Sequence, residues 1–202
     1  MKKLLIILIT VCLLVASSCS SKPKVTRVDA GTQTDLSGYW NDTDVRIVCE
    51  SLIRDCINSP RVAQAIANKR NKLPVVLVGS FKNESSEHID TTIISSTMEA
   101  TIFNSGKLDF VAGGSTRLEL REERQDQQSN ASEETAAKLA NETGADFLMT
   151  GSVRSIVDKA ANETVRTYFV YAEMTDIETN MRMWMGQNAE IKKVIVQPRF
   201  KF

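Results

Sequence analysis

The 202-residue sequence contains few of the residues on which common catalytic and metal sites depend. It has one histidine, His88, and four cysteines. A single histidine excludes a histidine-rich metal site and argues against a Ser-His-Asp arrangement. Gly113 and Gly114 are not followed by the lysine of a phosphate-binding loop, and they do not have the glycine spacing of a dinucleotide-binding motif. The sequence therefore predicts no catalytic residue, no metal site and no cofactor, so we expect a protein that is not an enzyme; this argues against a cell-wall hydrolase in particular.

The sequence also has no excess of charge of either sign, because 25 basic residues balance 25 acidic residues. Nucleic-acid binding depends on clustered Lys and Arg that neutralise phosphates, and no such cluster is present. The hydrophobic share of 42% and the charged share of 25% are ordinary for a globular chain. The composition favours one globular domain without a nucleic-acid partner.

A long hydrophobic run that could cross a membrane is absent too. Lys2 and Lys3 precede an uncharged apolar run over residues 4–15, and small residues follow at 16–18. A spanning helix needs roughly 20 apolar residues, so this run is typical of a secretory signal peptide. We assign residues 1–18 to a signal peptide.

Cys19 follows the small residues directly. Residues 15–19, Val-Ala-Ser-Ser-Cys, resemble the lipobox of bacterial lipoproteins, in which a diacylglycerol is attached to the cysteine. We therefore expect lipid attachment at Cys19, membrane contact through that lipid alone, and, because Ser20 follows, an outer-membrane location that faces the periplasm. The alternative is an ordinary signal peptide followed by an unmodified Cys19.

Residues 19–35 are polar and show no hydrophobic periodicity. They are expected to form a lipidated N-terminus and a short flexible tether, which as a coil would span about 20–25 Å. Residues 36–202 then form a single globular domain.

The clearest helical pattern covers 41–57 and begins at a capping residue, Asn41. Cys49 and Cys56 lie seven residues apart in this helix, about 10.5 Å along its axis, which is beyond the reach of a disulfide. They are therefore expected to be buried free thiols. Further helices are expected at 88–105, 115–128 and 132–143. The apolar face of the first helix comprises Val45, Val48, Cys49, Leu52, Ile53, Cys56 and Ile57.

Short apolar or alternating runs predict the strands of one sheet. The most regular run has Tyr168, Val170, Ala172 and Met174 at alternate positions. The fold class is therefore α+β, with a mixed sheet of about five strands that ends in an antiparallel C-terminal meander and is packed by three to four helices. The expected strands are 74–79, 108–112, 145–157, 164–176 and 181–196.

Four blocks of sequence resemble the LpoB family of outer-membrane lipoproteins, which activate bifunctional penicillin-binding proteins. They are 35–44 (DLSGYWNDTD), 83–89 (NESSEHI), 121–128 (REERQDQQ) and 144–152 (GADFLMTGS). The resemblance implies a domain similar to the amino-terminal domain of TolB. It also implies a non-enzymatic regulator that contacts a peptidoglycan synthase in the periplasm.

Six residues are candidate contacts for that synthase, because loops and exposed charges carry recognition more often than core strands do. An exposed helix-cap residue and a solvated charged face are the alternative interpretations of His88 and the arginines. The candidates are Asn83, Ser85, Ser86, His88, Arg121 and Arg124.

The tether is shorter than the long proline-rich linker of better-studied family members. This leaves open an inner-membrane anchor, a different envelope arrangement or another partner. The alternative function is a structural or secretion-assembly envelope lipoprotein of the CsgG or TolB type, in which 164–196 would form a long hairpin. A monomer is expected for the activator.

Overall fold

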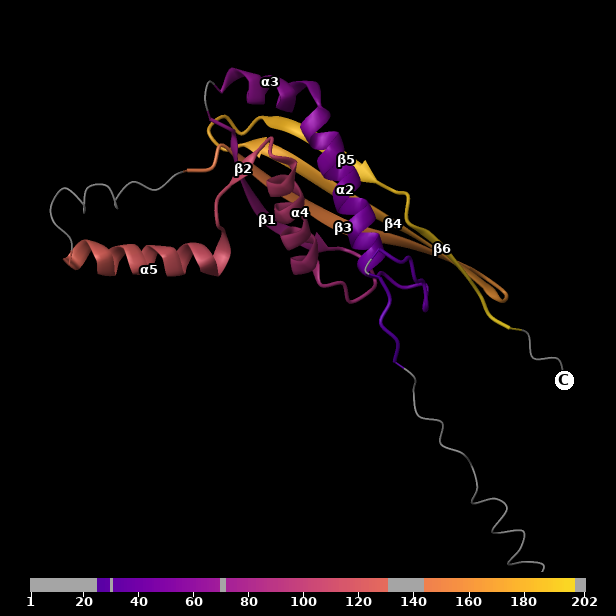
Figure 1. Cartoon of the computed structure of the whole chain (residues 1–202). Helices are drawn as coiled ribbons and strands as arrows, with labels where there is room; N and C mark the ends of the chain where they lie inside the picture. Colours follow the sequence, from indigo (N-terminus) through magenta and orange to yellow (C-terminus); the bar gives the residue numbers. More distant parts are fainter. Residues whose placement is uncertain (1–24, 30, 70–71, 131–143, 199–202) are drawn as a thin grey trace, which may run out of the picture. The chain divides into compact units, whose positions relative to one another are not determined.

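The computed structural model describes residues 25–29, 31–69, 72–130 and 144–198 (Figure 1). The described residues from Gln33 onward belong to one compact unit, and those before it belong to a second. In the second unit the only regular feature described is a turn, in which the Thr32 amide donates to the Asp29 carbonyl at 3.0 Å. Among the described residues from Gln33 onward, the structure has four helices and six strands: α2 (Asp42–Asn58), α3 (Pro60–Asn68), β1 (Val75–Asn83), α4 (Thr91–Ser105), β2 (Asp109–Phe110), α5 (Gly114–Asn130), β3 (Phe147–Ala160), β4 (Glu163–Asp176), β5 (Arg182–Asn188) and β6 (Lys192–Val196).

The strands form one mixed sheet in the order β2-β1-β3-β4-β5. β1 is parallel to both β2 and β3, whereas β4 is antiparallel to both β3 and β5. β6 pairs with β4 as well, along residues 163–167 and beyond the part that pairs with β5. The α+β class and the antiparallel C-terminal meander are confirmed.

The core lies between this sheet and the helices α2 and α4, which pack against each other and against the sheet (Figure 1). Tyr168, Val170, Ala172 and Met174 of β4 are all completely buried, as their alternation predicts. Six of the seven predicted apolar positions of α2 are buried, and Ile57 is half-buried. Asn41 caps α2 in a capping box, since its side chain accepts from the Asp44 amide at 3.1 Å while Asp44 accepts from the Asn41 amide at 3.0 Å.

Cys49 and Cys56 are free and buried, as predicted. Burial in this apolar layer raises the pKa of each thiol to about 12. A thiol with such a pKa stays protonated and is a poor nucleophile at neutral pH.

The prediction of one C-terminal strand over 181–196 is wrong, because this segment is divided into β5 and β6. Ile191 turns into the core, and its carbonyl accepts from the Tyr168 amide at 2.9 Å, so the chain bends between the two strands. In the described part of the chain the sheet therefore has six strands, although β5 and β6 share one edge of β4. The 164–196 segment consequently forms three strands of the core sheet and not a separate hairpin.

Other boundaries also differ from the prediction. The gap between the expected strands 145–157 and 164–176 shrinks to residues 161 and 162, since Ala160 still pairs with Glu163. α4 begins after an Asp90 cap rather than at His88, and β1 extends to Asn83. α3 was not expected; it begins at Pro60, directly after α2, and proline is common at the first position of a helix. The helix expected over 132–143 lies outside the described residues.

Candidate partner-binding site

The loop that follows β1 carries four of the six predicted contact residues. Asn83, the last residue of β1, braces it: its Nδ2 donates to the Glu87 carbonyl at 2.7 Å, and its Oδ1 accepts from the Ser85 amide at 3.0 Å and the Ser85 hydroxyl at 2.7 Å. Ser86 and His88 are exposed. The loop therefore exposes the side chains of Ser86 and His88, while hydrogen bonds with Asn83 hold its backbone in place.

Glu87 points inward from the same loop and is almost completely buried. Its Oε1 forms an ion pair with Nε of Arg166 at 2.8 Å, and both side chains are less than a tenth exposed. The hydroxyl of Tyr168 lies 2.8 Å from each carboxylate oxygen and donates to the carboxylate. Burial and this contact with Glu87 raise the pKa of Tyr168, so the phenol remains a proton donor at neutral pH. The loop is thus attached to β4 by a buried charge pair.

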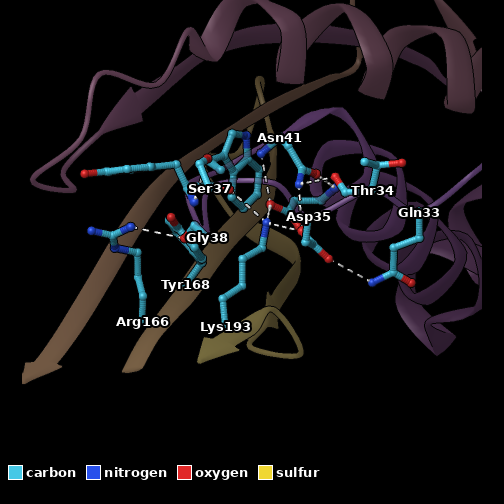
Figure 2. Close-up of polar contacts among 12 residues, drawn as sticks. Gln33, Thr34, Asp35, Ser37, Gly38, Asn41, Arg166, Tyr168 and Lys193 are labelled. Carbon is cyan, nitrogen blue, oxygen red and sulfur yellow. Dashed lines mark hydrogen bonds and ion pairs between the residues drawn. The ribbon is translucent and has the colours of Figure 1, made fainter. Parts of the chain in front are cut away.

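The N-terminal segment 35–41 is joined to the same buried pair. The Trp40 amide donates to Oε2 of Glu87 at 3.4 Å, and the Trp40 ring meets Tyr168 edge to face at 5.2 Å. Nη1 of Arg166 donates to the Gly38 carbonyl at 3.1 Å, and its guanidinium lies 4.3 Å from the centre of the Tyr39 ring. Figure 2 shows the hydrogen bond from Arg166 to Gly38. Segment 35–41 and the 83–88 loop are therefore held together through β4.

A second buried cation, Lys193 of β6, fixes the other end of this segment. Its Nζ lies 2.6 Å from Oδ2 of Asp44 and donates to the Tyr39 carbonyl at 2.8 Å. The same Nζ lies 2.7 Å from Oδ1 of Asp35 (Figure 2). The hydrogen bond from Lys193 lowers the pKa of Asp35. Burial raises the pKa of Asp44, and Lys193 opposes that rise. The cation is therefore balanced by two carboxylates.

The other predicted site residues lie elsewhere. Arg121 and Arg124 are on α5, which shares no broad contact with β1 or α4, the elements that flank the loop. The structure brings four of the six predicted residues together and leaves the two arginines on a separate helix. Cys19 lies outside the described residues.

The buried residues that hold the loop and the N-terminal segment in place were not predicted as site residues. Glu87 stood inside a block of family resemblance, and Tyr168 was predicted only as core. Arg166 and Lys193 had no signal at all, because one sequence does not reveal which charges meet between distant parts of the chain.

Within the described residues, no group of three or more His, Cys, Asp or Glu side chains is placed to hold a metal ion. No helix in that part of the chain has the length and apolar character needed to cross a membrane. The side chains instead fix the exposed 83–88 loop and segment 35–41 to the sheet through buried ion pairs. Such a rigid surface is suited to contact with another macromolecule.

The sequence matches the family described as peptidoglycan-synthase activator LpoB over residues 44–190. The chain belongs to this family, which places it among the regulators of peptidoglycan synthesis. No curated protein matches the chain.

Among solved structures, the chain is similar to the LpoB C-terminal domain from Salmonella enterica, with 14% identity, a TM-score of 0.43, and coverage of 76% of this chain and 99% of that one. The corresponding domain from Escherichia coli shows 15% identity, a TM-score of 0.44, and coverage of 71% and 96%. Lipoprotein GNA1162 from Neisseria meningitidis shows 18% identity, a TM-score of 0.38, and coverage of 63% and 87%.

Proposed function

We propose that this protein is a lipid-anchored, non-enzymatic activator of a peptidoglycan synthase, a bifunctional penicillin-binding protein. It acts by protein–protein contact in the periplasm and is held on the outer membrane by the lipid on Cys19. The observation that supports this most is membership of the activator family over residues 44–190. The physical account is a population shift, in which the activator binds the active conformation of the synthase more tightly than the inactive one.

The 83–88 loop supports a contact role because it is ordered before binding. An interface that is already rigid loses less conformational entropy when a partner docks. Ser86 and His88 are exposed and are the direct contacts, whereas Asn83 and Ser85 hold the loop in shape. Arg121 and Arg124 form a second contact through α5.

The test combines purified synthase with the purified full chain and measures binding, glycan polymerisation and cross-linking. The wild-type chain should bind and raise both rates. His88→Ala and Ser86→Arg should weaken synthase binding without changing the melting temperature. Lys107→Ala, which changes an exposed residue outside the loop, should leave both synthase binding and the melting temperature unchanged. No binding and no rate change with the wild-type chain would overturn the proposal.

The membrane anchor is tested separately by fractionation and mass spectrometry. The wild-type protein should fractionate with the outer membrane and carry acyl chains on Cys19, and Cys19→Ala should release it. Size-exclusion chromatography in detergent should give a monomer. An unacylated, freely secreted wild-type polypeptide would show that the anchor is wrong.

A further inference from the structure

A cleft of about 440 Å³ lies between residues 35–38 and β6. All five residues of β6, Lys192–Val196, line it. Because successive side chains of a strand point to opposite faces, a cavity that touches five consecutive residues faces the backbone edge of the strand. β6 pairs with β4 along its other edge, and within residues 25–29, 31–69, 72–130 and 144–198 no strand pairs with the edge that faces the cleft. The cleft therefore exposes the hydrogen-bonding groups of a strand edge.

The wall opposite β6 is rigid. Gly38 has a φ of +69°, and an added Cβ there would overlap the side chain of Ile195, so only glycine lets the chain lie this close to β6. Lys193 holds Asp35, and Arg166 holds the Gly38 carbonyl. The cleft is consequently preformed, and an occupant need not order it.

The side chains beside this edge define what it can accept. Lys192, Val194 and Val196 share the face of β6 that points away from Lys193, and the two valines are 56% and 62% exposed. Lys193 is balanced by Asp35 and Asp44, whereas no carboxylate among the described residues forms an ion pair with Lys192. An acidic side chain beside Lys192 and aliphatic side chains beside the valines would complement this face.

We propose that β6 and residues 35–38 form a slot for an extended segment of the synthase, which adds to the free edge of β6 as a further strand. Main-chain hydrogen bonds supply affinity, and an acidic residue followed by aliphatic residues at alternate positions supplies specificity. The identity of this partner rests on the function proposed above.

Two exposed positions of β6 and two matched positions of β3 test the slot in the full chain. Lys192→Glu and Val194→Asp should each weaken synthase binding at least about tenfold. Lys159→Glu and Ile156→Asp make the same chemical changes at exposed positions of β3, away from the cleft, and should bind as the wild type does. All four should keep the wild-type melting temperature, because these side chains are exposed.

Hydrogen–deuterium exchange supplies a readout at the backbone. When the synthase binds, amides of residues 192–196 should gain protection, whereas amides of residues 156–160 should not. Normal synthase binding by Lys192→Glu and Val194→Asp, with unchanged exchange in β6, would overturn the slot while leaving the activator function intact. Self-association of the wild-type chain that is lost in Val194→Asp would show a second copy as the occupant and would also overturn it.

A peptide probe separates failure of the slot from failure of the proposed function. The peptide Asp-Thr-Val-Thr-Val-Ser should bind the wild-type chain more tightly than Lys192→Glu, and a version with lysine in place of its aspartate should reverse that order. If the wild-type chain does not bind the synthase but binds the two peptides with the expected preferences, the synthase is refuted as the partner and the slot is supported. Equal binding of the peptide to both chains refutes the slot.

Discussion

The hydroxyl of Tyr168 lies 2.8 Å from both carboxylate oxygens of Glu87, although 81 residues separate them in the sequence. Glu87 belongs to the loop after β1, and Tyr168 belongs to the centre of β4. Arg166, on the same face of β4, completes the contact with its ion pair to Glu87. One carboxylate thereby holds the candidate contact loop against the core.

Loss of the Glu87 carboxylate should destabilise the fold strongly. Glu87→Ala leaves the Arg166 charge buried without its partner, and breaking a buried pair typically lowers the free energy of unfolding by about 3–5 kcal/mol. Glu87→Gln keeps a hydrogen-bond acceptor for Tyr168 and should lower it less, by about 1–3 kcal/mol. Urea denaturation followed by tryptophan fluorescence measures both values.

Glu84 provides the control in the same loop. It forms an ion pair with Arg154 at 2.6 Å, but the two side chains are 40% and 67% exposed. An exposed pair contributes at most about 1 kcal/mol, so Glu84→Gln should change stability little. Equal losses in Glu84→Gln and Glu87→Gln would show that the buried pair has no special role.

Replacing Lys193 should change how stability depends on pH. Lys193→Met removes the hydrogen bond that lowers the pKa of Asp35 and the contact that opposes the raised pKa of Asp44. A carboxyl with a higher pKa in the folded state than in the unfolded state binds a proton more readily when folded, so stability rises as the pH falls through that window. The variant should lose about 3 kcal/mol at pH 7 and less at pH 4.

The matched control is Lys192→Met, which removes the neighbouring exposed cation. It should change the free energy of unfolding by less than about 0.5 kcal/mol at both pH values. Urea denaturation at pH 4 and pH 7 measures all three proteins. A loss of stability in Lys193→Met that is the same at both pH values would contradict the role of Lys193 in setting the pKa of Asp35 and of Asp44.

The parts of the fold that the sequence predicted are those decided locally. Asn41 and Asp44 stand three residues apart, as a capping box requires, and the apolar face of α2 follows from helical spacing. Asn83, Ser85, Ser86 and His88 were chosen because loops carry recognition more often than core strands do, and the structure exposes Ser86 and His88, while their contact role stays a prediction. Local spacing sufficed for the cap and the apolar face of α2.

The parts that escaped prediction depend on tertiary contacts. The break between β5 and β6 arises because Ile191 fits into the core beside Tyr168, which no alternation within 181–196 indicates. The partners of Glu87 and Asp44 lie on β4 and β6, and charge spacing along one chain does not reveal them. The candidate loop could therefore be chosen from the sequence, whereas the buried residues that hold it could not.

The two buried thiols should resist modification in the native protein. Burial raises the pKa of Cys49 and Cys56 to about 12, so thiolate is scarce at pH 8. Iodoacetamide should label neither residue in buffer and both in 6 M guanidinium, as read by peptide mass spectrometry. Rapid labelling of either in the native state would show that α2 opens readily from the sheet.

Gly151 of β3 should tolerate no side chain. The register of β1 against β3 shifts between Val78 and Phe81, and this irregularity brings the buried Phe81 ring over Gly151. A Cβ at position 151 would overlap both that ring and the carbonyl oxygen of Tyr171, which is backbone and cannot rotate away. Gly151→Ala should lower the free energy of unfolding by about 3 kcal/mol, at the upper end of overpacking costs.

Gly144 is the matched control, because an added Cβ there meets no atom within 4 Å. Gly144→Ala should leave stability unchanged or raise it by about 0.4–1 kcal/mol, since alanine restricts the unfolded chain. Phe81 lies two residues before Asn83, so a shift of β1 in Gly151→Ala should also disturb the 83–88 loop. Faster amide exchange in that loop than in α2 would accompany the loss of stability, whereas a Gly151→Ala variant as stable as Gly144→Ala would show that the close approach of Phe81 is not required.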